Sequence, residues 1–241
     1  MKNQTWQQMK EKINKDTVAL LPVGSVEQHG LHAPMGTDLI IAQSLASTQK
    51  ENAVVVPGVP VGVSEYHRHF PGSLWVSPEA LKLYVGDIVK SLLFQGIKKV
   101  IIVNGHGGNM GPLKEMGRYL EMDYDIRIVV WTWFEGIEDK IIEMYGERPP
   151  LHADEVETSM LMAVAPELVI KENLKKSAEG ASKRWGSFFN GTMVSLNVRD
   201  FSTSGATGNP GKANAEDGLK LLGYAREDLK QLINYISKNK H

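Results

Sequence analysis

Cysteine is absent from the 241 residues. This excludes disulfide bonds, thiolate metal ligands and a cysteine nucleophile together. The formal net charge is −1 and there is no basic block, so no nucleic-acid partner is expected. No apolar run approaches the roughly 20 residues that span a bilayer, and the first residues lack the apolar core of a signal peptide. These absences favour a cytoplasmic enzyme or binding protein with no membrane partner.

Strand and helix patterns alternate along the chain. The predicted strands cover residues 17–23, 53–59, 98–103, 126–131 and 193–198. The predicted helices cover residues 2–14, 39–50, 78–93, 113–122 and 154–165, and a last one covers roughly the final 25 residues, with Leu219 and Ile236 on its apolar face. Strands separated by helices predict an α/β fold with a mostly parallel sheet covered on both faces. We expect residues 1–241 to form a single domain.

A polar loop follows the first predicted strand and contains Glu27, His29, His32 and Asp38. Glu27 and His29 are two residues apart, so an extended segment would point both side chains to the same side. Asp38 lies where the next helix begins, and a carboxylate there is also favoured by the exposed backbone amides. The loop therefore indicates either a metal site or a polar loop in which Asp38 caps the helix.

The segment Asn104–Asn109 follows another predicted parallel strand and places His106 between glycines. Open α/β sheets bind ligands at the edge where parallel strands end, and glycine lets the backbone approach a ligand closely. A single histidine in such a turn is also common as a hydrogen-bonded structural residue. The position of His106 beside the first loop favours the functional interpretation.

The segment His152–Ser159 carries a histidine followed by Glu155 and Glu157 near a predicted helix start. Carboxylates there are favoured by the helix N-terminus whatever their function. The functional alternative is a metal-binding carboxylate with a histidine placed for proton transfer. Because Glu155 and Glu157 cannot face the same way on a helix, at most one should reach the site.

These motifs resemble the creatininase (creatinine amidohydrolase) family. The resemblance rests on segments 24–32, 37–38, 104–109 and 152–159, with further similarity at 70–73 and 208–218. It implies a three-layer αβα fold, a homo-oligomer (a hexamer in the family) and two divalent metal ions per chain. Mixed imidazole and carboxylate ligands suit Zn²⁺, Mn²⁺ or Fe²⁺.

The resemblance also implies roles for individual residues. The implied metal ligands are Glu27, His29, His106 and a bridging Asp38, and His152 matches the catalytic histidine. Creatininase has a ligand glutamate where this chain has Gly108, and Glu157 is the candidate to replace that carboxylate and to take part in catalysis. Substrate contacts are expected from His69, Gly107, Gly108 and Trp133.

The predicted reaction is hydrolysis of a C–N bond in a small cyclic amide by hydroxide shared between two ions, with His152 protonating the departing nitrogen. The alternatives are a formamide deformylase acting on a pyrimidine-type intermediate, a hydrolase of a cyclic diketone, and a non-catalytic metal- or sugar-binding protein. A serine hydrolase is disfavoured, because Ser25 lacks a Gly-x-Ser-x-Gly elbow.

Overall fold

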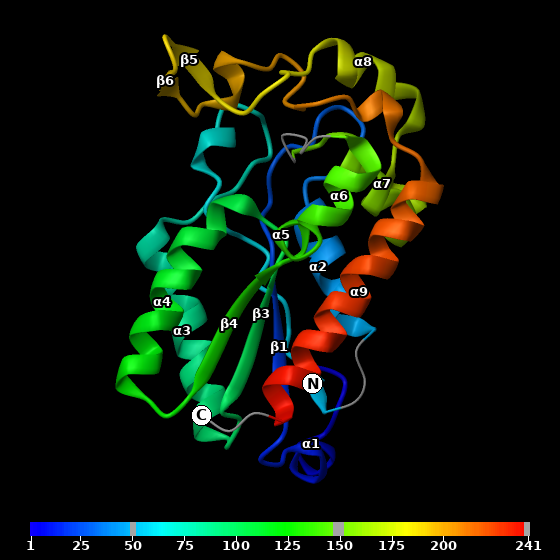
Figure 1. Ribbon diagram of the computed structural model, residues 1–241. Helices are drawn as coiled ribbons and strands as arrows, with labels where there is room; N and C mark the ends of the chain where they lie inside the picture. Colours follow the sequence, from blue (N-terminus) through cyan, green and yellow to red (C-terminus); the bar gives the residue numbers. More distant parts are fainter. Residues whose placement is uncertain (49–51, 147–151, 239–241) are drawn as a thin grey trace.

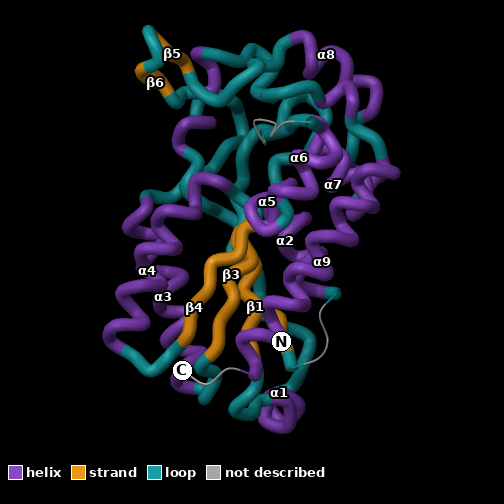
Figure 2. The backbone as a smooth tube through the Cα atoms, in the orientation of Figure 1, coloured by secondary structure: helices purple, strands orange, loops and turns teal. Residues whose placement is uncertain are grey.

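A parallel sheet forms the centre of the computed structural model, which describes residues 1–48, 52–146 and 152–238. In these residues the sheet has four strands in the order β2–β1–β3–β4, with helices on both faces (Figures 1 and 2). The strands are β1 (Val18–Val23), β2 (Ala53–Val55), β3 (Lys99–Asn104) and β4 (Arg127–Thr132). The α/β fold with a mostly parallel sheet is confirmed.

Alternate residues of the sheet supply two separate cores. All six residues of β1 and of β3 are buried. Leu20 and Ile101 pack into the core on one face, whereas Leu21 and Ile102 pack into the core on the other. Because successive side chains of a strand point to opposite faces, a central strand buried on both sides is apolar over most of its length.

Each core is closed by its own set of helices (Figure 1). One face carries α2 (Thr37–Ser47), α5 (Trp133–Gly136), α6 (Glu138–Tyr145), α7 (Glu155–Val164) and α9 (Ala215–Lys238). The other carries α1 (Trp6–Lys12), α3 (Pro78–Phe94) and α4 (Met110–Asp123). The Ser77 side chain caps α3 as its sequence indicates, accepting a hydrogen bond from the backbone N–H of Ala80.

Several predicted boundaries are corrected. The first helix begins only at Trp6, where Thr5 caps it. Strand β2 ends at Val55, shortly before Pro57, which has no N–H for strand pairing. The predicted end of the second helix at Lys50 lies outside the described residues.

The strand predicted at 193–198 is β6 (Thr192–Ser195), which pairs with β5 (Ser187–Phe189) in a separate antiparallel hairpin. Helices α5, α6 and α8 (Leu174–Glu179) were not predicted from the sequence. Short 3-10 helices complete the described chain: η1 (Glu65–His67), η2 (Gly107–Asn109), η3 (Pro166–Leu168), η4 (Lys171–Asn173), η5 (Val198–Asp200) and η6 (Pro210–Lys212).

The chain leaves β1, β3 and β4 at one edge of the sheet, below the β5–β6 hairpin and α8 in Figure 1. This shared edge brings the predicted polar motifs together. Within the described ranges, no helix combines the length and apolarity needed to cross a membrane.

Candidate metal centre

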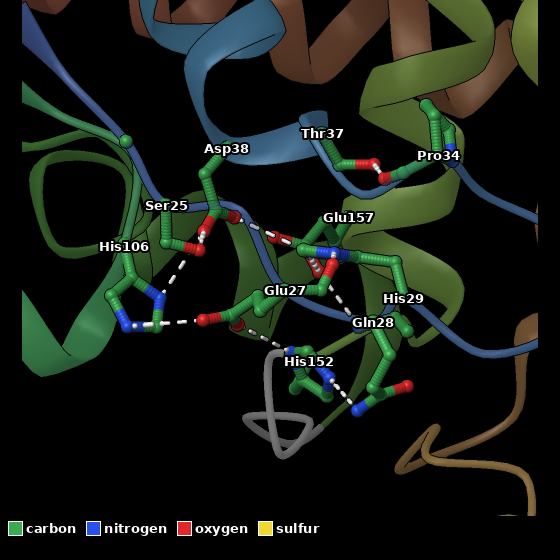
Figure 3. Close-up of polar contacts among 12 residues, drawn as sticks. Ser25, Glu27, Gln28, His29, Pro34, Thr37, Asp38, His106, His152 and Glu157 are labelled. Carbon is green, nitrogen blue, oxygen red and sulfur yellow. Dashed lines mark hydrogen bonds and ion pairs between the residues drawn. The ribbon is translucent and has the colours of Figure 1, made fainter. Parts of the chain in front are cut away.

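Glu27 and His29 lie in the loop after β1, and both side chains are buried. Backbone hydrogen bonds hold this loop on either side, from Glu27 N–H to Met35 O and from Leu74 N–H to Val26 O. Figure 3 shows both side chains turned toward a cluster of buried polar residues. We define this cluster as Glu27, His29, Asp38, His106, His152 and Glu157. The two-residue spacing therefore acts as predicted for an extended segment.

Asp38 connects the two halves of this cluster. It is the second residue of α2, whose start shows no side-chain cap. One carboxylate oxygen lies 3.1 Å from His29 Nε2, while the other lies 3.2 Å from His106 Nδ1 and accepts a 2.7 Å hydrogen bond from Ser25 Oγ. The capping interpretation of Asp38 is wrong, because its carboxylate is directed between two imidazoles.

His106 reaches the cluster from the turn after β3. Its Nε2 lies 3.3 Å from Glu27 Oε2. The approach depends on Gly105, where a Cβ would lie 2.2 Å from the backbone oxygen of Asp38. A side chain at Gly105 would therefore force the two loops apart.

Helix α7 contributes one of its two first-turn glutamates, as predicted. Asp154 caps the helix by accepting hydrogen bonds from the N–H groups of Val156 and Glu157. Glu157 turns inward, with Oε2 3.5 Å from His29 Nε2 and 2.6 Å from the N–H of Ala153. Glu155 turns away and accepts a 2.6 Å hydrogen bond from the N–H of Asn209.

Gly108 is enclosed by its neighbours. A Cβ there would lie 2.2 Å from Val63 O, 2.3 Å from the Tyr66 hydroxyl and 2.7 Å from His106 Nε2. A glutamate at this position would need backbone and ring movement. The missing carboxylate of the family motif therefore has no space here, whereas Glu157 already lies within the cluster.

Backbone carbonyl oxygens define which nitrogen of each predicted ligand histidine is available. A carbonyl oxygen only accepts hydrogen bonds, so the ring nitrogen facing it must carry the proton. His29 Nδ1 lies 3.0 Å from Glu27 O, and His106 Nε2 lies 2.9 Å from Val63 O. When each ring is neutral, the opposite nitrogen, which faces Asp38, is the one with a lone pair for a metal ion.

The electrostatics of the cluster are dominated by burial and by carboxylate–imidazole attraction. Burial raises the pKa of Glu27 to about 8. Burial disfavours a charged His106, but the carboxylates of Glu27 and Asp38 outweigh it and raise the pKa of His106 to about 9. Glu157 and Asp38 likewise outweigh burial at His29, whose pKa lies well above its usual value.

Glu27 shows that the residues fit a cation. Both of its carboxylate oxygens are buried and make no hydrogen bond to the described residues, although imidazole nitrogens lie 3.2–3.5 Å away. A buried carboxylate that makes no hydrogen bond is costly unless a charge compensates it. Glu27, Asp38 and His106 offer ligand atoms within 4.8 Å of one another, as do His29, His152 and Glu157. This donor set suits zinc, manganese or iron.

His152 lies beside the carboxylates, with Nδ1 3.5 Å from Glu27 Oε1. Burial and the nearby His67 and His29 lower the pKa of His152 well below its usual value. His152 also borders a cavity of about 370 Å³. Besides the cluster residues, the cavity is lined by Tyr66, Gly105, Gly107, Gly108, Met110, Phe134, Trp185 and Leu196.

Two predicted substrate contacts are corrected, since neither residue lines this cavity. Trp133 is 1% exposed and packs in the core, and its neighbour Phe134 borders the cavity instead. His69 is exposed, whereas His67 at the end of η1 is buried, with Nε2 3.2 Å from Glu27 Oε1. The other two predicted contacts, Gly107 and Gly108, do line the cavity.

Four residues near the cavity had no predicted role: Gln28, Tyr66, His67 and Trp185. Gln28 bonds to His152, Tyr66 contacts His106, and the Trp185 ring lies 5.6 Å from that of His152. Gln28 stands within the first motif and His67 two residues before His69, so both could have been considered. His32, by contrast, is held outside the cluster by Ser177 and Thr158.

Residues 2–233 match the family model of creatininase, described as creatinine amidohydrolase. This chain belongs to the creatininase family. The family is one of amidohydrolases, and the chain shares its hydrolase class.

Relatives within the creatininase family have different substrates. A 3-dehydro-scyllo-inosose hydrolase of Thermotoga maritima is 31% identical over 70% of this chain, which covers 57% of that protein. The mycofactocin precursor peptide peptidase of Mycolicibacterium smegmatis is 30% identical, covering 85% of this chain and 79% of that protein.

Solved structures support the same fold. A suggested creatinine amidohydrolase from Bacteroides fragilis aligns with a TM-score of 0.81 at 31% identity, covering 95% of this chain and 93% of that one. A creatininase described as a manganese form aligns with a TM-score of 0.83 at 22% identity, covering 99% and 98%, which shows the fold alone.

Proposed function

We propose that this chain is a dinuclear metal-dependent amidohydrolase that cleaves a C–N bond of a small amide. The observation that carries the proposal is Asp38, whose two oxygens face imidazoles on opposite sides. One ion would be held by Glu27, Asp38 and His106, and the other by His29, Asp38 and Glu157. We propose zinc, manganese or iron for both ions, and the solved creatininase described as a manganese form supports a metal of this kind.

Bound divalent ions would act as Lewis acids and make hydroxide available near neutral pH. The chain's own residues supply the remaining functions. The cavity of about 370 Å³ favours a small substrate. His152 borders the cavity and would relay a proton from the attacking water to the departing nitrogen. The buried position of His152 keeps bulk solvent away from this transfer.

A substrate panel tests the reaction class. Protein loaded with Mn²⁺ or Zn²⁺ should be assayed against cyclic amides, formamides, short peptides and cyclic diketones by detection of the released products. We expect hydrolysis of an amide that stops on chelation and returns when metal is restored. Hydrolysis of the cyclic diketones alone would contradict the proposed C–N specificity.

The two glutamates of α7 provide a matched test of the second ion position. Glu157→Gln should lower the metal content from two ions to one per chain, because only Glu157 faces His29. Glu155→Gln is the control and should keep both ions, because Glu155 bonds to the Asn209 backbone instead. Elemental analysis decides: two ions retained at wild-type affinity in Glu157→Gln would show that Glu157 does not bind metal directly.

Metal affinity should increase with pH. Without metal, Glu27 with a pKa of about 8 and His106 with a pKa of about 9 are both protonated at neutral pH. A ligand must lose its proton to bind an ion, so binding releases protons and is weaker at lower pH. We expect apparent zinc affinity to increase from pH 6 to about pH 9 and then to level off. Calorimetry in buffers of different ionisation enthalpy measures this proton release, and a pH-independent affinity would contradict it.

A further inference from the structure

Gln28 lies between the proposed ligands Glu27 and His29, yet its side chain serves two other histidines. It is buried, and its Nε2 lies 2.8 Å from His67 Nδ1 and 2.8 Å from His152 Nε2. Figure 3 shows its contact with His152. The carboxamide of Gln28 therefore contacts His67 and His152, the two histidines of the site that are not proposed as metal ligands.

Two backbone groups fix the orientation of this carboxamide. The N–H of Gly30 donates a 2.9 Å hydrogen bond to Gln28 Oε1, and Nε2 donates a 3.0 Å hydrogen bond to Gly205 O. A backbone N–H requires an acceptor and a carbonyl requires a donor, so the amide oxygen and nitrogen cannot be exchanged. At Gly205 a Cβ would lie 1.9 Å from Gln28 Oε1, so glycine there permits this packing.

The amide nitrogen offers hydrogens and no acceptor. Its two hydrogens are shared among three acceptors: Gly205 O, His67 Nδ1 and His152 Nε2. Neither ring can turn an N–H toward a group that has no acceptor, so both of these ring nitrogens are unprotonated. The ring protons then reside on His67 Nε2 and His152 Nδ1, which face Glu27 Oε1 at 3.2 Å and 3.5 Å. A protonated ring nitrogen has no lone pair for a metal ion.

This pattern is the reverse of that in the two proposed ligand histidines. In neutral His29 and His106 a backbone carbonyl oxygen holds the proton on one nitrogen, so the lone pair of the other faces Asp38. In His67 and His152 the Gln28 amide holds the lone pair on the far nitrogen, so an N–H faces Glu27. The four imidazoles are divided into two that can bind metal and two that can donate protons.

We propose that Gln28 is a positioning residue that keeps His67 and His152 out of metal coordination and holds the His152 proton on Nδ1, beside the substrate. The inference rests on the proposed function. Without the Gln28 amide, Glu27, His67 and His152 would form a further metal position, because their ligand atoms lie within 4.8 Å of one another. An ion there would remove the proton donor.

Imidazole ¹⁵N NMR of the zinc-loaded protein tests the proton positions directly, since protonated and unprotonated ring nitrogens give different signals. His67→Gln and His152→Gln variants assign the rings. We expect the proton on Nδ1 of His152 and on Nε2 of His67. A proton on Nε2 of His152 would overturn the proposal. This readout requires no turnover, so its failure is distinguishable from failure of the proposed reaction.

Gln28→Met keeps the length of the side chain and removes its N–H groups. We expect the proton to redistribute in both rings and the zinc content in excess metal to increase from two to three ions per chain. Turnover should fall roughly 10²-fold at saturating substrate, with a smaller change in KM. Wild-type proton positions and two ions in this variant would overturn the proposal.

Ser177→Ala is the matched control, because it removes a buried hydrogen bond to a different imidazole, that of His32. It should keep two ions and unchanged proton positions at His67 and His152. A third ion in Ser177→Ala would show that any buried polar change opens the site and would also overturn the proposal. If Gln28→Met does not fold, the NMR result on the wild-type chain decides.

Discussion

Asp38→Ala should lose both metal ions and all measurable hydrolysis. Its carboxylate oxygens lie 3.1 Å from His29 Nε2 and 3.2 Å from His106 Nδ1, so the proposed ion positions share this one residue. Loss of an outer hydrogen-bonding partner weakens metal binding roughly 10–100-fold. Loss of a ligand common to both ions should exceed that at each position. Elemental analysis after dialysis measures the effect, and circular dichroism checks the fold.

Ser25→Ala is the control for this experiment. The Ser25 hydroxyl donates a 2.7 Å hydrogen bond to the same carboxylate, but Ser25 itself is not a proposed ligand. This variant should retain both ions with affinity lowered within the roughly 10–100-fold range. If Asp38→Ala keeps one ion at wild-type affinity, Asp38 does not bridge and the two positions are independent.

His152→Ala should separate catalysis from metal binding. The proposed role of His152 is to supply a proton to the departing nitrogen, which does not require contact with the ions. The variant should keep its full metal content and lose roughly 10²–10⁴-fold in turnover. KM should change much less, because the proton is needed only in the transition state. A substrate with a better leaving group should be less affected.

His69→Ala is the matched control, because His69 is exposed and does not line the cavity. It should retain wild-type turnover and metal content. Loss of an ion in His152→Ala would identify His152 as a ligand, and the proton donor would have to be another group. Unchanged turnover on every substrate would show that His152 has only a structural role.

The architecture was predictable from local patterns. The apolar runs of β1 and β3 and the amphipathic pattern of α9 are features of short sequence windows. Position along the chain then indicated that the turns after β1 and β3 meet at one sheet edge. The prediction that only one of Glu155 and Glu157 reaches the site needed only helix geometry, and the structure agrees.

The two predicted substrate contacts that do not line the cavity are His69 and Trp133. In both cases the direction of the side chain is determined by a short turn of the backbone. His69 was predicted to contact the substrate, but the 3-10 turn η1 directs the nearby His67 inward instead. Trp133 was placed in the substrate pocket, but the chain turns into α5 at this residue, which buries Trp133 and leaves Phe134 at the cavity. Which side chain of a short turn points into the site depends on the local backbone conformation, and the hydrophobic periodicity of the sequence does not predict it.

Contacts across long sequence separations were also not predictable. Trp185 lies 33 positions after His152, and the packing of its ring against Tyr66 and His67 follows from where the chain folds back over the sheet edge. Gln28 was visible in the first motif, but its role depends on Gly205, which is distant in the chain. The types of the metal ligands could therefore be predicted from the sequence, but the distant residues that orient the side chains of the site could not.

The central claim is a centre of two ions joined by Asp38, and anomalous X-ray diffraction from crystals loaded with Mn²⁺ or Zn²⁺ tests it most directly. The account predicts two anomalous peaks, one contacted by Glu27, Asp38 and His106 and the other by His29, Asp38 and Glu157. A single peak, or an ion held by His67 and His152, would contradict it.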